Sequence, residues 1–232
     1  MASSGSERTA DELGRAFPHT RVIVADGDHP VATVDGRPAL VIATRGAEPI
    51  ATGGYRAVLL LDGDRMLMAD DLRIGESCLR WWSNAAALAA PGAPVHLVGV
   101  AGPVARALAT WTQPAYARSE LVERAPLRMP PTVRVAAVEG TVREVDAALA
   151  AVRAALPDLD SDAVLGPLTP PGEAPTRALV RFDYPQGRAA TEALRAAVVA
   201  AALRTRRRAK GGGPPMPRNT LKVRVDVPDP DL

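Results

Sequence analysis

Three apolar runs of strand length near the N-terminus constrain the fold of this 232-residue chain more than any other feature. They are RVIVAD (21–26), ALVIAT (39–44) and AVLLLD (57–62), and a fourth run, VHLVGVA, follows at 95–101. Each run is bounded by Gly, Asp or Pro and is apolar at nearly every position, which is typical of strands that are covered on both faces. Helical stretches at about 71–90 and from Ala105 onward alternate with these runs. We therefore expect a parallel α/β sheet in the first half of the chain.

Two capping boxes predict where helices begin. Thr9 precedes Glu12, and Thr141 precedes Glu144, with the spacing that lets a threonine hydroxyl accept a hydrogen bond from the backbone N–H three residues on. After the second box, apolar residues recur on one face of a helix. They are Val142, Val145, Leu149, Val152 and Leu156.

The second half of the chain has a different order of elements. TVRVAAVEG (132–140) alternates like a half-buried strand, and the helix just described follows it. The remaining elements are AVLGPL (163–168), RALVRFDY (177–184), a helix over about 186–208 and LKVRVDV (221–227). This β-α-β-β-α-β order predicts a ferredoxin-like, split-βαβ domain of the α+β class.

The stretch ELVERAPLRMPP, a short helix closed by two prolines, separates the two halves. We therefore predict a first domain over residues 1–118, a proline-containing connector over 119–131 and a second domain over 132–232. Aromatic residues make up 3% of the chain, so both cores must be built from Ala, Val and Leu. No apolar run approaches the roughly 20 residues needed to cross a bilayer, and MASSGSERT lacks the apolar region of a signal peptide. The sequence thus predicts a cytoplasmic protein without a membrane segment.

Basic residues are concentrated near the C-terminus. The net charge is +2, and residues 203–225 contain eight basic residues and no acidic one. Arginines outnumber lysines 26 to 2, and the planar guanidinium group suits phosphate, although the same bias is typical of a GC-rich genome. The candidate DNA- or partner-binding residues are Arg204, Arg206, Arg207, Arg208, Lys210, Arg218 and Lys222.

Two interpretations of this basic stretch remain open. Cations at the C-terminus of a helix complement its dipole, so the residues could form only a solvated face. Five such residues at one helix end also repel one another, and a polyanion would relieve that repulsion while releasing counterions. Few aromatic residues lie among the arginines, so we expect contact with phosphates and no stacking on bases.

Residue patterns for catalysis are weak. Neither lysine follows a glycine, which excludes a P-loop. The Gly53-Gly54 pair fits a tight turn better than an anion cradle, and Asp62 with Asp64 at a strand end fits a turn or helix cap better than a metal site. Cys78, the single cysteine, excludes a disulfide and a cysteine-based zinc site and is predicted to be a buried thiol.

The histidines and the Trp81-Trp82 pair are predicted to have structural roles. His19, His29 and His96 lack the spacing of metal ligands, so we expect surface or packing roles. Of Trp81 and Trp82, one is predicted to lie in the core and the other to pack on a neighbouring domain. No residue is predicted to be catalytic.

The segments GSERTADELGRAFP (5–18), LVIATRGAEPIATGGYRAVLLLDGD (40–64), ELVERAPLRMPPTVRVAAVEG (120–140) and VRVDVPDPDL (223–232) occur in an order similar to one family. The chain resembles the C-terminal portion of the primosomal protein N′ (PriA) replication-restart helicases in their actinobacterial form. The resemblance implies a partial second RecA-like helicase lobe followed by a domain that contacts branched or single-stranded DNA, single-strand-binding protein and other primosome components.

Departures from the family pattern bear on catalysis. The resemblance implies arginine fingers near residues 82–92, where this sequence has alanines, around Ala87 and Ala90. Such an arginine contributes about 10³–10⁵ in rate. IATRGAEP also differs from the family's nucleotide-coupling motif, and the zinc-binding cysteines and the P-loop lobe are absent from this sequence. We therefore expect no ATP hydrolysis and no bound ATP, Mg²⁺ or zinc.

Three functional hypotheses follow. The first is a non-catalytic module that binds DNA and assembles the primosome near the nucleoid. The second is a protein-interaction module in which the arginines grip the acidic tail of single-strand-binding protein. The third is a degenerate nucleotide-binding domain that uses the carboxyl edge of the parallel sheet.

Overall fold

The protein is known from a computed structural model that describes residues 5–171, 175–210 and 221–227. The chain divides into two compact units, Met1–Ala117 and Arg118–Leu232. Within the described residues, no helix combines the length and the apolar character needed to cross a membrane.

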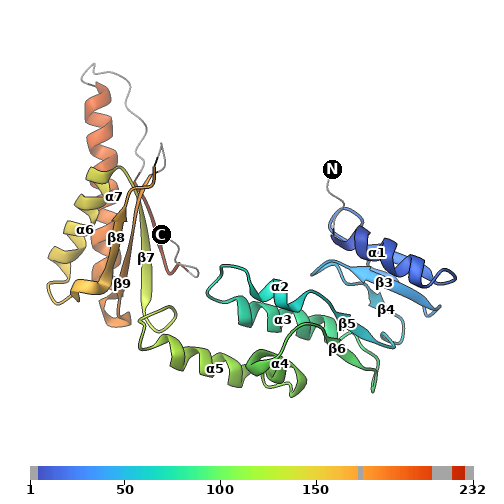
Figure 1. Ribbon diagram of the computed structural model, residues 1–232. Coiled ribbons are helices and arrows are strands. Elements are labelled where there is room, and N and C mark those ends of the chain that lie inside the picture. Colours follow the sequence, from blue (N-terminus) through green and yellow to red (C-terminus); the bar gives the residue numbers. More distant parts are fainter. Residues whose placement is uncertain (1–4, 172–174, 211–220, 228–232) are drawn as a thin grey trace. The chain divides into compact units, whose positions relative to one another are not determined.

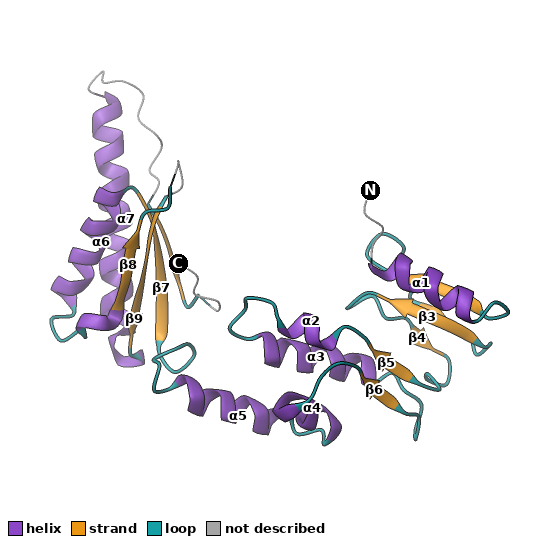
Figure 2. Ribbon diagram, viewed as in Figure 1, coloured by secondary structure: helices purple, strands orange, loops and turns teal. Residues whose placement is uncertain are grey.

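The first unit is a mixture of helices and short parallel strand pairs (Figures 1 and 2). Its elements are α1 (Gly5–Ala16), β1 (Arg21–Ala25), β2 (Thr33–Val34), β3 (Ala39–Ala43), β4 (Ile50–Ala51), β5 (Val58–Leu60), α2 (Gly63–Leu67), α3 (Ile74–Ala86), β6 (Val95–Leu97) and α4 (Gly102–Ala109). The helix α5 (Gln113–Arg124) begins in this unit and ends in the second.

The four apolar runs form strands that pair in parallel, as predicted, but not in one sheet. Among the described residues β1 pairs with β3, β2 with β4 and β5 with β6, which gives three two-stranded sheets. The strands are also less covered than their sequences predict, since every residue of β3 is only partly buried and Leu59 in β5 is 60% exposed. The expectation of strands covered on both faces is therefore wrong for these runs, because helices pack on only part of their surface. The RecA-like lobe remains a prediction.

The capping box expected at Thr9 is also wrong. The helix α1 begins one turn earlier, at Gly5, so Thr9 lies inside it. There the Thr9 hydroxyl donates to the backbone oxygen of Gly5 at 2.9 Å instead of accepting from the backbone. At Thr141 the prediction is confirmed, because its hydroxyl accepts from the Glu144 backbone and the Glu144 side chain accepts from the Thr141 N–H.

The second unit is a four-stranded antiparallel sheet with two helices. Its elements are β7 (Arg134–Gly140), α6 (Val142–Ala155), the 3₁₀ helix η1 (Ser161–Ala163), β8 (Val164–Leu168), β9 (Thr176–Phe182), the 3₁₀ helix η2 (Tyr184–Gln186), α7 (Gly187–Lys210) and β10 (Lys222–Val225). The strand order is β10-β7-β9-β8, and each neighbouring pair is antiparallel. The β-α-β-β-α-β order that the sequence predicts is therefore present.

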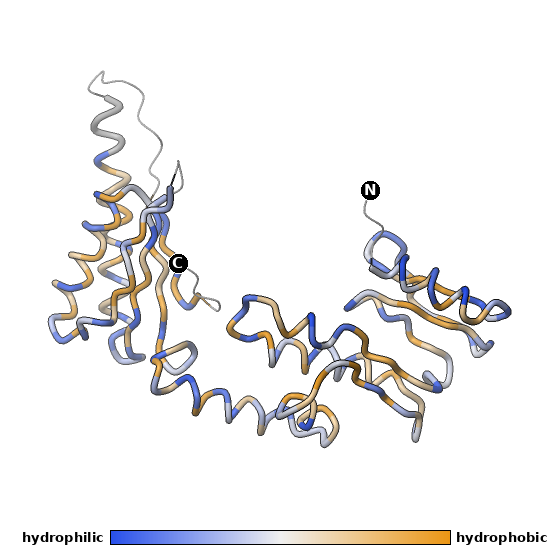
Figure 3. Tube along the Cα trace, in the orientation of Figure 1, coloured by the Kyte–Doolittle hydropathy of each residue, from blue (hydrophilic) through white to orange (hydrophobic). Residues whose placement is uncertain are grey.

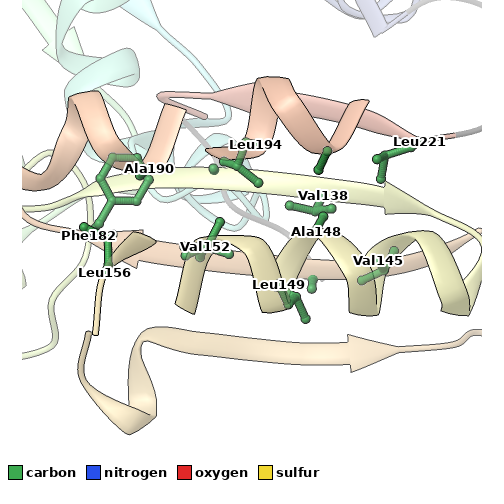
Figure 4. Packing of buried hydrophobic residues seen from close by; sticks show 14 of the residues in the cluster. Val138, Val145, Ala148, Leu149, Val152, Leu156, Phe182, Ala190, Leu194 and Leu221 are labelled. Atoms are coloured by element: carbon green, nitrogen blue, oxygen red, sulfur yellow. The ribbon is translucent and has the colours of Figure 1, made fainter. Parts of the chain in front are cut away.

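Alternation along the strands separates the two faces of this sheet. Ala136 and Val138 of β7 point into the main core, which also contains residues of β9, α6 and α7 (Figure 4). Val135 and Ala137 lie on the other face in a smaller cluster. Both helices thus cover the same face of the sheet, as Figure 1 shows. We call the other face, which neither α6 nor α7 covers, the helix-free face. The strands are largely hydrophobic along their middle parts (Figure 3).

The packing of the core predicts how much two leucine substitutions in α7 lower the free energy of unfolding. Leu194 is 1% exposed in the core, whereas Leu203, on the same helix, is 50% exposed. Leu194→Ala should lower the free energy of unfolding by about 2–5 kcal/mol, because it removes buried methyl groups and leaves a cavity. Leu203→Ala, the matched control, should change it by less than about 0.5 kcal/mol. The urea dependence of amide hydrogen exchange in β7 and β9 measures both values, and equal effects would contradict this packing.

Candidate nucleic-acid interface

The predicted basic residues fall on the last turns of α7 and the start of β10. Arg204 and Lys222 are exposed. Arg206, Arg207, Arg208 and Lys210 lie in the last turns of the α7 backbone, and their side chains are outside the described part of the structure. Arg218 lies outside the described residues as well.

The topology brings these two segments to one end of the unit. The helix α7 follows β9 and leads to β10, so it runs back along the sheet toward the end where β9 starts and β10 starts. Ala201 is 2% exposed, whereas Leu203 is 50% exposed, so the helix leaves the core just before Arg204. Figure 1 shows the last turns of α7 extending past this end of the sheet. We call it the basic end.

Two further arginines lie at the basic end, on the helix-free face of the sheet. In the sheet, Lys222 of β10 lies opposite Glu139 of β7, and Glu139 lies opposite Arg177 of β9. Arg224 of β10 reaches the same carboxylate, with its Nη2 atom 3.1 Å from Glu139 Oε1. Arg177 and Arg224 are not among the binding residues predicted from the sequence. Their alternation with buried apolar residues, in TRALVRF and KVRV, was the available signal.

At the opposite end of the sheet, arginines are paired with aspartates. Arg128 contacts Asp160 and Asp183, and Arg181 lies 3.3 Å from Asp162. The second unit is therefore electrically polarised, with cations in surplus at the basic end and balanced ion pairs at the other. A local surplus of this kind attracts polyanions.

An ion pair anchors the strand that carries Lys222 and Arg224. The Arg134 guanidinium donates two hydrogen bonds, of 2.8 and 2.7 Å, to the Asp226 carboxylate just beyond β10. These hydrogen bonds hold the pKa of Asp226 below its usual value and raise the pKa of Arg134. The Arg134 side chain also passes so close to Gly187 that a Cβ there would lie 2.2 Å from its Nη1 atom. A larger residue at the start of α7 would therefore require the Arg134 guanidinium to move.

The other candidates from the sequence lie in the first unit and form no comparable group. Gly53 and Gly54 have positive φ, and a Cβ on Gly54 would lie 2.7 Å from the Ala90 backbone, so the pair makes a turn with a close backbone approach. Asp62 immediately precedes α2, and Asp64 lies in its first turn. Among the described residues, no group of three or more His, Cys, Asp or Glu side chains could hold a metal ion.

The expected arginine-finger positions and the tryptophans are likewise part of the packing. Ala87 caps α3, and the Ala90 N–H donates to the Tyr55 carbonyl at 2.8 Å. Trp82 is 3% exposed in the core, as predicted for one of the two tryptophans. Trp81 packs within its own unit, under the Arg45 guanidinium at 3.7 Å.

The cysteine and the three histidines of the first unit lie either in the core or at its surface. Cys78 is fully buried, as predicted, and burial raises the pKa of its thiol. His29 contacts Asp26 at 3.2 Å, and His19 and His96 are exposed.

Comparison with known proteins connects the chain with replication restart. Residues 125–230 match the family described as primosomal protein N C-terminal domain. Proteins named "Probable replication restart protein PriA" from Mycobacterium tuberculosis (strain H37Rv) and Mycobacterium bovis are each 39% identical over 237 residues, which covers 96% of this chain and 35% of theirs. The Mycobacterium leprae protein of the same name is 43% identical over 198 residues, which covers 79% of this chain and 30% of its own. The chain thus spans about a third of the length of these relatives.

The Arg134–Asp226 pair predicts a pH-dependent stability difference. A carboxylate whose pKa is lower in the folded protein than in the unfolded chain stabilises the folded state at pH values above its unfolded pKa, which is near 3.8 for Asp226. This stabilisation is lost as the pH falls through the lower pKa of the folded state. Asp226→Asn should therefore destabilise the second unit at pH 7 by about 0.5–1 kcal/mol, the range for a well-oriented surface pair. The difference from the unsubstituted protein should vanish at low pH.

Hydrogen exchange of the β7 and β10 amides over a pH series measures this difference. Asp146→Asn makes the same charge change on the exposed surface of α6 and is the matched control. A penalty at Asp226 that stays constant down to the lowest pH would show that the carboxylate charge does not contribute.

Proposed function

Because residues 125–230 belong to the primosomal protein N C-terminal domain family, and nearly the whole chain is related to replication restart protein PriA, we propose that it binds DNA as part of a replication-restart protein. The convergence of the α7 end and the β10 start at the basic end carries this proposal. The substrate class is branched or single-stranded DNA, contacted through its phosphates. The setting is the bacterial cytoplasm at the nucleoid.

The composition of the second unit favours contact with phosphates over reading of bases. Phe182 and Tyr184 are the only aromatic residues in the chain after Tyr116. Phe182 is the last residue of β9 and Tyr184 follows it, at the end of the strand away from the basic end. Single-stranded nucleic acid is usually held by stacking bases on aromatic side chains together with a positively charged groove. With the charges at one end and the rings at the other, binding at the basic end is electrostatic and independent of sequence.

We further propose that this chain does not hydrolyse ATP. The sequence contains no Gly-Lys-Ser or Gly-Lys-Thr segment that could cradle a triphosphate. Ala87 and Ala90, at positions where the resemblance implies arginine fingers, have no group that could neutralise a phosphate.

A second candidate partner is the acidic tail of single-strand-binding protein, and the surface of α7 favours it. A shallow groove on this helix is lined by Glu192, Arg195, Ala196, Val199, Ala200 and Leu203. Val199 and Leu203 are each about half exposed, and their i, i+4 spacing places them side by side on one face of α7. An acidic peptide with apolar side chains could place them in this groove and its carboxylates on Arg195 and Arg204.

The DNA proposal predicts a change in salt dependence. Replacing Arg206, Arg207 and Arg208 together with Ala should weaken binding to fork DNA and flatten its dependence on salt. Each lost phosphate contact removes about 0.7–0.9 from the slope of log K against log salt. The matched control replaces Arg8, Arg15 and Arg37, exposed arginines of the first unit, with Ala.

Fluorescence anisotropy at a series of salt concentrations measures both slopes. An unchanged slope in the first triple variant would remove the α7 end from the interface. A loss in the control of the same size would show that only the net charge matters.

The tail proposal predicts a different pattern. Val199→Glu should weaken binding of an acidic peptide with apolar side chains by about tenfold, because a carboxylate in the groove repels the peptide and removes an apolar contact. Val122→Glu, which changes an exposed valine of α5, should leave binding unchanged. Competition between peptide and fork DNA, followed by anisotropy, shows whether they share the basic end. Equal binding by both variants would exclude the groove.

A further inference from the structure

The helix-free face of the second unit carries a row of charged side chains across three adjacent strands. Lys222 of β10 is opposite Glu139 of β7, which is opposite Arg177 of β9. Arg224, two residues along β10, points to the same face. We call these four residues the sheet-face cluster. The cluster contains three cations and one carboxylate, a surplus of two positive charges, and two of the cations form ion pairs with that carboxylate.

Glu139 is held between two arginines. Its Oε1 atom lies 3.1 Å from Arg224 Nη2 and 3.7 Å from Arg177 Nε. The Glu139 side chain is 15% exposed, whereas Arg177 is 38% and Arg224 64% exposed. The Glu139 carboxylate is therefore largely shielded from solvent, whereas the arginine side chains that contact it remain accessible.

Stability of the sheet does not account for three cations here. Exposed ion pairs contribute about 0–1 kcal/mol each, and a single arginine would neutralise Glu139. The three cations carry like charge on one face of the sheet, two on β10 and one on β9, and repel one another. Elsewhere on this face Val135, Ala137 and Leu179 form a small apolar cluster, so packing of the face does not require charged side chains.

We propose that the sheet-face cluster is a second phosphate-contact site, in which phosphodiester oxygens take the place of the Glu139 carboxylate on Arg177 and Arg224. Glu139 then acts as an internal competitor that weakens the site. This inference rests on the proposed DNA binding and adds a separate surface to it. The planar guanidinium groups suit phosphate oxygens as well as carboxylate oxygens.

The dimensions of the cluster suit a nucleic-acid backbone. The strands β10 and β9 flank β7, so Lys222 and Arg177 stand two strand spacings apart, or about 10 Å. One strand of a duplex carries about one phosphate per 3.4 Å of helix axis, so a backbone that crosses the cluster can bring more than one phosphate to it. The cluster and the α7 end both lie at the basic end, so a single polyanion can contact the two surfaces.

Removing the competitor tests this site. Glu139→Gln in the full chain should tighten binding of a thymidine oligonucleotide about three- to tenfold at low salt, because the phosphate no longer has to break two surface ion pairs. It should also steepen the dependence on salt, since more cations become available. Arg224→Ala and Arg177→Ala should weaken binding and flatten that dependence. Arg224 is exposed enough that its loss should leave the fold intact, which thermal unfolding checks.

Glu12→Gln is the matched control, because Glu12 is an exposed carboxylate 3.0 Å from Arg8 in the first unit. Equal tightening in both variants would show a general charge effect and overturn the site. If the unsubstituted chain binds the oligonucleotide and the cluster variants do not alter that binding, this inference fails while the proposed function stands. If the unsubstituted chain binds no DNA, the proposed function itself fails.

Discussion

The one-sided burial of the four-stranded sheet is the constraint from which the rest of the second unit follows. Ala136 and Val138 of β7 face α6 and α7 and are fully buried. Such small side chains let both helices pack closely on the same face, so the core forms with a single large aromatic residue, Phe182. Since burial of apolar surface is the main stabilising term, the helix side determines register and strand order. The other face is then free to carry charges.

Antiparallel topology converts this layering into a separation of charge. The α7 C-terminus, the start of β10 and the start of β9 must meet at one end of the sheet, because α7 connects the far end of β9 with β10. Cations from distant parts of the sequence meet there, while Arg128, Arg134 and Arg181 are paired with aspartates elsewhere in the unit. The Arg134–Asp226 pair and the Val227 N–H, which donates to the Val135 carbonyl at 3.2 Å, hold β10 in place. The anchor of the strand is thus separate from its charged residues.

In the first unit, the residues that could suggest nucleotide chemistry have packing roles. Gly54 allows a close backbone approach to Ala90, Trp82 fills the core and Cys78 is buried beside it. Arg45 stacks on Trp81, a contact that restricts the guanidinium group. These contacts give the named residues of the first unit a structural role. The surface proposed for binding lies on the polarised second unit.

Local patterns in the sequence determined the second unit almost completely. Period-two alternation in 132–140, the Thr141–Glu144 capping box and the apolar face of α6 depend on neighbouring residues only, so they could be predicted from the chain alone. The same patterns placed Arg204 and Lys222 next to the connection between α7 and β10. In the first unit the strands and their parallel pairing could be predicted in the same way.

Tertiary structure decided the features that depend on contacts between distant residues. Whether Thr9 caps a helix depended on where α1 begins, and whether apolar runs become fully covered strands depended on which helices pack on them. The sheet-face cluster belongs to this class, because Glu139, Arg177 and Arg224 are far apart in the sequence and meet only through strand register. Alternation assigns a side chain to a face, but only pairing with a particular neighbouring strand decides which charges it meets.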